Sequence, residues 1–171
     1  MTGCVQVYTG DGKGKTTAAL GLAIRAAGAG MRVFLARFLK PAVSSELRAL
    51  ERFADLVTVR SYGRAGFIRG EPGPEDIARA REGFEEVREA VASGGYLLVI
   101  LDEVNVAVDL GLLEVEEVLD LIEERPEQVE LVLTGRRADA RIIERADLVT
   151  DMREVKHPWH AGVPARKGID L

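Results

Sequence analysis

Short apolar runs alternate with longer amphipathic stretches along the whole chain. Six of these runs are predicted to be strands: residues 4–8, 33–38, 57–62, 97–101, 131–134 and 148–152. Residues 97–101 and 131–133 are apolar without alternation, a pattern typical of strands that are buried on both faces. These runs therefore favour a sheet that is covered on both sides.

The stretches between the runs carry helical periodicity. Apolar residues recur at steps of three and four from Ile77 to Val91, and again from Val115 to Ile122. The alanine-rich stretch 15–29 predicts a buried helix that ends near Gly28 or Gly30. Strands that alternate with helices predict an α/β fold of three layers, with a mostly parallel sheet of about six strands between helices.

Length and charge limit the possible classes of protein. The chain has 171 residues, which predicts a single domain spanning 1–171, because domains typically have about 100–200 residues. The net charge of −5 argues against a nucleic-acid partner. Apolar runs stay well below the roughly 18 residues that a membrane helix needs, so we expect no membrane association. Cys4 is the single cysteine, which favours a cytoplasmic location, and we expect it to be buried as a small apolar residue of the first strand.

The strongest chemical signal is a glycine-rich loop between the first predicted strand and the first predicted helix. Its sequence is Thr9-Gly10-Asp11-Gly12-Lys13-Gly14-Lys15-Thr16-Thr17. Glycines allow successive backbone amides to face one anion, and the helix N-terminus adds positive partial charge. Lys15 would neutralise phosphate oxygens, and Thr16 would ligate Mg²⁺ through its hydroxyl. We therefore predict that this loop binds nucleotide phosphates.

The loop departs from the general phosphate-loop pattern in one place. That pattern requires glycine at position 9, where Thr9 stands, and Gly10 comes one residue late. A dinucleotide fingerprint fits worse, because its third glycine falls on Lys15. The alternative is a glycine-rich turn with solvated lysines, but the coincidence of strand, loop, Gly-Lys-Thr and helix favours phosphate binding.

Two further strand ends supply candidate site residues. The run 97–101 leads into Asp102 and Glu103, the usual second half of a nucleotide site. Asp102 would hold Mg²⁺ directly or through water, and Glu103 would polarise a water molecule or position a ribose. The alternative is an ordinary acidic turn. Arg136 follows the next predicted strand and would either reach a phosphate or remain a solvated loop residue.

Several motifs together resemble a known family, the ATP:corrinoid adenosyltransferases of cobalamin synthesis, which have a RecA-type phosphate-loop fold. The matching segments are residues 7–19, 25–28, 38–40, 101–105, 111–113, 125–126, 133–136, 146–150, 155–157, 161–162, 165–166 and 168–170. The loop alone is not specific to this family, but its combination with Val-Lys-His and a Gly-Ile-Asp end is. The late Gly10 is normal for the family.

The resemblance implies a reaction and its participants. A cobalt(I) corrinoid attacks the 5′-carbon of ATP, and inorganic triphosphate leaves. The short loop holds the triphosphate reversed relative to ordinary NTPases, which opens the 5′-carbon to attack. Since cobalt(I) is itself a strong nucleophile, no general base is needed. The resemblance also implies Mg²⁺, a reductant protein or flavin that supplies cobalt(I), and a homodimer.

The same resemblance assigns roles to individual residues. Lys15, Thr16 and Glu103 would be catalytic, and Thr16 with Asp102 would hold Mg²⁺. Residues Asp11 to Thr17 would hold the triphosphate, while Arg25 and Glu103 match positions near the ribose. The complete set expected to bind ATP is Thr9, Gly10, Asp11, Gly12, Lys13, Gly14, Lys15, Thr16, Thr17, Arg25, Glu103 and Arg136.

Two poorly patterned regions, 63–74 and 154–171, are predicted to be loops. In the first, the family usually has Gly-Phe-Thr-Trp, and this chain has Gly66-Phe67-Ile68-Arg69. We expect Phe67 and Arg69 to contact the corrinoid, with Arg69 meeting its carboxylates or amides, and the segment to act as a lid. The alternative is an exposed aromatic beside a solvated arginine. In the tail, we expect Trp159 to pack and His157 to be a hydrogen-bond partner.

Two other functions are compatible with the residues themselves. The first is a plain phosphate-loop ATPase or kinase with Glu103 as the base. The second is a nucleotide-sensing module in which ATP binding orders residues 63–74. Adenosyl transfer predicts triphosphate release, hydrolysis predicts ADP and phosphate, and a sensor predicts no turnover.

Overall fold

The computed structural model describes residues 2–64 and 72–170. It contains one parallel six-stranded sheet in the order β3-β2-β4-β5-β1-β6. The strands are β1 (Val5–Thr9), β2 (Val33–Arg37), β3 (Val57–Ser61), β4 (Leu98–Asp102), β5 (Glu130–Thr134) and β6 (Leu148–Asp151). The α/β prediction is confirmed, and each predicted strand boundary lies within one residue of the observed one.

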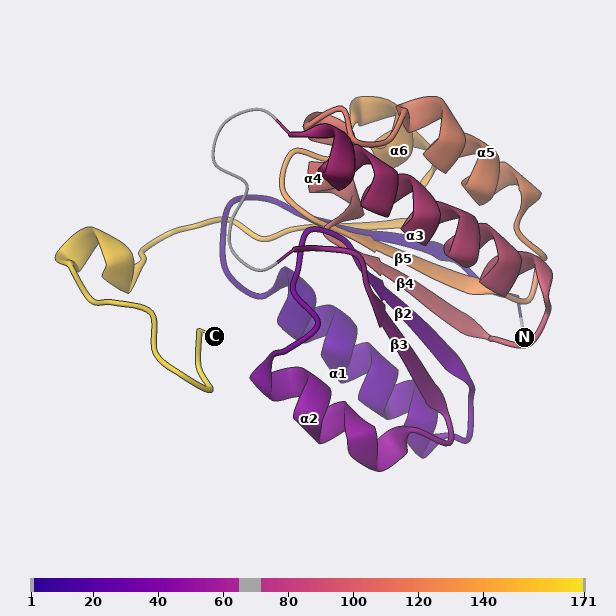
Figure 1. Cartoon of the computed structure of the whole chain (residues 1–171), viewed down its shortest axis with the longest axis horizontal. Coiled ribbons are helices and arrows are strands. Elements are labelled where there is room, and N and C mark those ends of the chain that lie inside the picture. Colours follow the sequence, from indigo (N-terminus) through magenta and orange to yellow (C-terminus); the bar gives the residue numbers. More distant parts are fainter. Residues whose placement is uncertain (1, 65–71, 171) are drawn as a thin grey trace.

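Helices cover both faces of the sheet (Figure 1). One face carries α1 (Lys15–Gly28) and α2 (Ser45–Leu50), which continues into the 3₁₀ turn η1 (Glu51–Phe53). The opposite face carries α3 (Pro74–Ala92), α4 (Val104–Asp109), α5 (Val115–Glu124) and α6 (Ala140–Arg145). The sequence did not predict α2, α4 and α6, because helices of six residues are too short to show a periodic apolar stripe.

The strands are sandwiched between two apolar layers. Along β2, Phe34 and Ala36 pack toward the α3 side, and Val33 and Leu35 pack toward α1. This alternation follows from the two-residue period of a strand, and both sets are buried. The continuous apolar runs in the sequence therefore reflect a sheet with no solvated face at its centre.

The topology brings the glycine-rich loop and the predicted residues at the strand ends to one edge of the sheet. Because all strands are parallel, the carboxyl ends of β1, β2, β4 and β5 lie together, and ligands of α/β proteins bind at this edge. Strand β1 lies between β5 and β6, so β5 separates it from β4. The segment after β6 leaves the layers, forms the 3₁₀ turn η2 (Pro158–Ala161) and returns toward the N-terminal end of α1 (Figure 1).

Two expectations from the sequence were wrong. Cys4 is exposed, because it alternates in phase with Gln6 and Tyr8, which are only partly buried, and out of phase with the buried Val5 and Val7. Trp159 is 67% exposed, because the tail extends away from the two apolar layers. His157 is a hydrogen-bond partner as expected, with its Nδ1 accepting the amide of Trp159 at 3.2 Å. Within the described part of the chain, no helix is both long and apolar enough to cross a membrane.

Candidate active site

The glycine-rich loop connects β1 to α1 and packs against the segment that follows β6. The amide of Gly12 donates to the carbonyl of Met152 at 2.6 Å. A Cβ atom at Gly12 would lie 2.6 Å from this carbonyl oxygen, so glycine is required for the close approach. Gly14 has a φ of 128°, a conformation that favours glycine, and it forms the N-cap of α1. The loop glycines thus allow the loop to pack closely against the segment after β6, in addition to leaving backbone amides accessible to a ligand.

The N-terminus of α1 has the properties of an anion site. Lys15, Thr16 and Thr17 are its first residues, and their amides have no carbonyl one helical turn earlier within the helix. No acidic residue lies in this first turn, and no side chain caps it. No side chain of the helix itself therefore neutralises the positive end of its dipole.

Lys15 lies almost fully inside the loop. Its Nζ donates to the carbonyls of Gly10 at 2.6 Å and Gly12 at 2.7 Å, and the residue is 8% exposed. Burial lowers the pKa of Lys15, and the nearby cations Arg136 and Lys40 lower it further. The ammonium is thus held at the centre of the loop by neutral acceptors.

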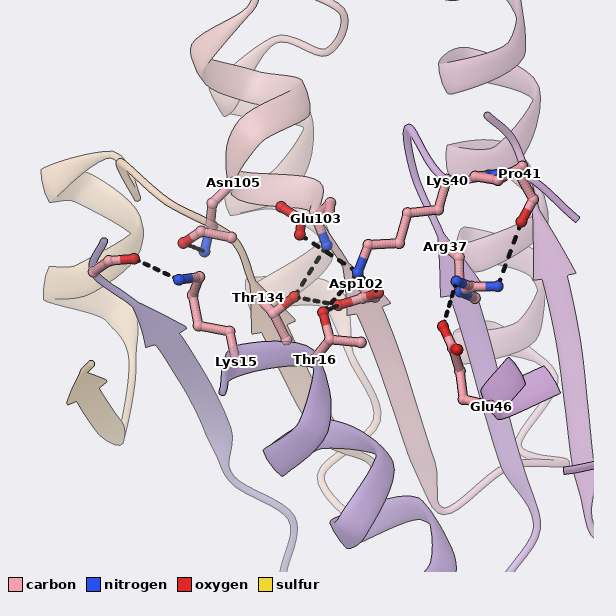
Figure 2. Close-up of polar contacts among 12 residues, drawn as sticks. Lys15, Thr16, Arg37, Lys40, Pro41, Glu46, Asp102, Glu103, Asn105 and Thr134 are labelled. Atoms are coloured by element: carbon pink, nitrogen blue, oxygen red, sulfur yellow. Dashed lines mark hydrogen bonds and ion pairs between the residues drawn. The ribbon is translucent and has the colours of Figure 1, made fainter. Parts of the chain in front are cut away.

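A hydrogen-bond cluster joins the start of α1 to the ends of β4 and β5 (Figure 2). Asp102 is 1% exposed, and its Oδ1 accepts the hydroxyls of Thr16 at 2.9 Å and Thr134 at 2.7 Å. The Thr134 hydroxyl in turn accepts the amide of Glu103 at 3.0 Å. The hydroxyl and carboxylate that the sequence assigned to Mg²⁺ therefore lie in direct contact.

Lys40 reaches the same cluster from the loop after β2. Its Nζ donates to the Thr16 hydroxyl at 2.6 Å and to Asp102 Oδ2 at 2.7 Å, and it lies 3.4 Å from Glu103 Oε1. Figure 2 shows this ammonium extending toward both carboxylates. One cation thus faces two anions and a hydroxyl at the carboxyl edge of the sheet.

Backbone strain concentrates at this edge. In residues 2–64 and 72–170, three residues other than glycine have positive φ: Leu39 at 60°, Glu103 at 64° and Arg137 at 53°. They follow β2, β4 and β5 respectively. Strained conformations of this kind typically persist at ligand-binding sites, where the surrounding structure holds them.

Arg136 and Thr9 also lie beside the loop. The guanidinium of Arg136 donates to the carbonyl of Asp11 at 3.1 Å, and the Thr9 hydroxyl accepts the amide of Ala138 at 3.3 Å. A hollow of about 300 Å³ adjoins the loop on its β6 side, lined by Gly10, Asp11, Asp151, Arg153 and Glu154.

The C-terminal tail contacts the loop through Lys13. The Nζ of Lys13 donates to Asp170 Oδ1 at 2.5 Å and to the carbonyl of Ile169 at 2.7 Å. Hydrogen bonds from Lys13 and Arg166 hold the pKa of the Asp170 carboxyl well below its usual range. The Gly-Ile-Asp end, which the sequence analysis used only as a family motif, therefore lies next to the predicted phosphate site.

The structure brings most of the predicted site residues together, with two exceptions. Arg25 lies in the last turn of α1, ten residues after Lys15 and therefore about 15 Å along the helix, so it is apart from the loop cluster. Phe67 and Arg69 lie outside the described residues. The assignments of Arg25 to the ribose and of Phe67 and Arg69 to the corrinoid stay predictions.

Sequence reasoning missed three residues of this site: Lys40, Thr134 and Asn105. Asn105 is fully buried, and its Oδ1 has no hydrogen-bond partner among the described residues. Lys40 follows the buried strand β2, and Thr134 ends the buried strand β5, so the position of each at a strand end could have marked it as a candidate. Their contact with Asp102 could not be predicted, because it depends on the strand order, which places β2 and β5 on either side of β4.

Fold and site together define a class of protein. An all-parallel sheet whose first strand runs through a glycine-rich loop into a helix, with an acidic residue ending a nearby strand, is consistent with a phosphate-loop NTPase-like fold.

Comparison with known proteins identifies the family. The family model of the ATP:corrinoid adenosyltransferase BtuR/CobO/CobP matches residues 1–171. The chain is 38% identical to a corrinoid adenosyltransferase of Pseudomonas aeruginosa over 170 residues, covering 99% of this chain and 84% of that protein. It is 37% identical to the Escherichia coli K12 corrinoid adenosyltransferase over 169 residues, covering 98% and 85%. A Sinorhizobium corrinoid adenosyltransferase is 34% identical over 172 residues, covering 99% and 80%.

The chain therefore belongs to the ATP:corrinoid adenosyltransferases. It is an enzyme of cobalamin biosynthesis that transfers an adenosyl group to a corrinoid, with ATP as the co-substrate. The family resemblance stated from the sequence is confirmed.

Proposed function

We propose that the loop from Thr9 to Thr17 binds the triphosphate of ATP and directs the 5′-carbon toward the corrinoid. The observation that carries this proposal is the 2.9 Å hydrogen bond between Thr16 and Asp102, which unites the helix N-terminus with the acidic strand end. Lys15 and the amides of α1 supply positive charge at one side of this contact, and Arg136 lies beside the loop. These groups match the chemistry of a polyphosphate.

The residues at this contact suit Mg²⁺. Thr16 and Asp102 offer a hydroxyl and a carboxylate, the oxygen ligands that this ion prefers. Among the described residues, no three His, Cys, Asp or Glu side chains are grouped so as to hold a metal ion. Mg²⁺ at Thr16 and Asp102 would therefore take further oxygens from the triphosphate, and when bound it would neutralise charge that develops on the leaving group.

The chain's own task in the transfer is to position and to neutralise. An electron pair of cobalt(I) forms the cobalt–carbon bond. The bond from the 5′-carbon to the triphosphate oxygen breaks, and the electron pair of this broken bond leaves with triphosphate. Lys15, Thr16 and the α1 amides would stabilise the charge on the departing oxygens. Glu103, which lies 3.4 Å from Lys40, would position the nucleotide rather than abstract a proton.

The remaining assignments concern the corrinoid and the cellular setting. We propose that Phe67 and Arg69 contact the corrinoid, that a reductant protein or flavin supplies cobalt(I), and that the enzyme acts as a cytoplasmic homodimer. The family match supports the corrinoid assignment. The single cysteine is consistent with a reducing compartment.

Product analysis tests the proposal directly. The enzyme is incubated with ATP, Mg²⁺ and a chemically reduced corrinoid, and the phosphate products are separated by ion exchange. We expect inorganic triphosphate in equal amount to a light-sensitive alkylcorrinoid. ADP and phosphate as the main products would instead support the ATPase alternative, with Glu103 as its base.

The variant Glu103→Gln separates these two roles of Glu103. Removing a catalytic base would abolish turnover at every ATP concentration, whereas removing a positioning group would mainly raise the KM for ATP. We expect the second result, with triphosphate still the product. Glu124→Gln is a matched control, because Glu124 ends α5 and pairs with Arg88 near the end of α3 rather than with a residue of the cluster.

A further inference from the structure

The ammonium of Lys40 lies where the oxygens proposed to hold Mg²⁺ converge. It contacts the Thr16 hydroxyl at 2.6 Å and Asp102 Oδ2 at 2.7 Å, with Glu103 Oε1 at 3.4 Å (Figure 2). These oxygens come from α1, β4 and the start of α4, while Lys40 comes from the loop after β2. We propose that Lys40 is a built-in cation of the metal site, which competes with free divalent ions for these oxygens. The inference rests on the proposed assignment of Thr16 and Asp102 to the metal.

Charge balance requires a cation at this position. Asp102 is 1% exposed, and a buried carboxylate is costly unless it is paired. Hydroxyls of Thr16 and Thr134 satisfy Oδ1, but they carry no charge. Lys40 supplies the charge at Oδ2, so the site already has its counter-ion before a metal arrives.

The backbone around Lys40 holds the side chain in place. Leu39, the preceding residue, has a φ of 60°, which turns the chain sharply after β2. The carbonyl of Lys40 accepts the amide of Gly63 at 3.1 Å. A Cβ atom at Gly63 would lie 2.2 Å from the backbone nitrogen of Lys40, so the two segments are in close contact. Lys40 is thus anchored at its backbone and extends its ammonium inward.

This arrangement makes metal entry conditional on the nucleotide. A divalent ion alone would have to displace an ammonium that has three oxygen partners. A triphosphate brings its own negative charge, which attracts Lys40 and supplies further oxygens for the metal. Lys40 therefore has a positioning role: it prevents binding of free metal and favours binding of the metal–nucleotide complex.

The test is a titration of the nucleotide-free enzyme with Mn²⁺, in which electron paramagnetic resonance detects the unbound ion. We expect weak binding to the natural chain and at least about tenfold tighter binding to Lys40→Met, because one positive charge a few ångströms away has been removed. Arg52→Met is the control for the loss of one positive charge. Arg52 is exposed on η1, outside the cluster, and the Mn²⁺ affinity of this variant should equal that of the natural chain.

A second substitution shows where the ion binds. The gain should disappear in Lys40→Met combined with Asp102→Asn. If Lys40→Met is poorly folded, Lys40→Gln replaces it, and the same gain is read as an increase in melting temperature on adding Mn²⁺. Equal Mn²⁺ affinity in the natural chain and the Lys40 variants would overturn the inference. Failure of the proposed function would instead appear as absent Mg²⁺–ATP binding by the natural chain.

Discussion

At the scale of single residues, the site is built from groups that already satisfy one another. Lys15 donates to two loop carbonyls, Asp102 accepts two hydroxyls and an ammonium, and Lys13 pairs with Asp170. An incoming polyphosphate must replace some of these partners with its own oxygens. The free energy of polyphosphate binding is therefore the difference between the new contacts to the phosphate oxygens and the hydrogen bonds of the free site that they replace.

Lys15→Met should weaken ATP binding by about 10- to 100-fold, since a hydrogen bond to a charged group contributes about 1.5–3 kcal/mol. The measurement is equilibrium titration with a fluorescent ATP analogue. Arg52→Met controls for the loss of one positive charge, because Arg52 is exposed on η1. An equal loss of affinity in both variants would argue against a direct phosphate contact by Lys15.

At the scale of elements, α3 is positioned by a close contact with the end of β3. Gly83 faces the ring of Tyr62, and a Cβ atom there would lie 2.4 Å from the ring. The Tyr62 hydroxyl also donates to Glu86 on the next turn of α3, at 2.8 Å. Burial and this carboxylate raise the pKa of Tyr62. The contact fixes α3 against the end of β3.

Gly83→Ala should therefore lower the free energy of unfolding by about 1–3 kcal/mol, the usual effect of overpacking, despite the better helix propensity of alanine. Urea denaturation followed by circular dichroism measures this change. The matched control is Gly21→Ala in α1, where nothing lies within 4 Å of the added Cβ. That control should raise stability by about 0.5–1 kcal/mol. Two changes of the same sign would contradict the packing argument.

The elements also show what the sequence could predict. Strand boundaries were predictable, because fully buried parallel strands leave continuous apolar runs such as residues 97–101. The loop, Thr16 and Asp102 were predictable from motif chemistry. Lys40 was not, because its role depends on β2 lying beside β4, a long-range pairing that local sequence does not encode. The prediction that Trp159 packs was wrong, because the tail lies away from the apolar layers of the sheet and offers the indole no surface to pack on.

At the scale of the whole molecule, phosphate binding should stabilise the entire fold, because the loop joins β1, α1 and the segment after β6. Inorganic triphosphate with Mg²⁺, at about 100 times its dissociation constant, should add about 2.7 kcal/mol and raise the melting temperature by about 5–10 °C. Differential scanning fluorimetry measures the shift. Adenosine at the same concentration, which has no phosphates, should give a much smaller one. A larger shift with adenosine would mean that the loop is not the main contact.

The position of β1 in the sheet has a consequence for biosynthesis of the chain. Its two neighbours, β5 and β6, start at residues 130 and 148, so the opening strand has no partner on either side until most of the chain has left the ribosome. Pairing across so many residues is slow, and an unpaired apolar strand promotes aggregation in the meantime. A nascent chain can thus assemble β2, β3 and β4 early, whereas its ability to recognise a nucleotide comes last.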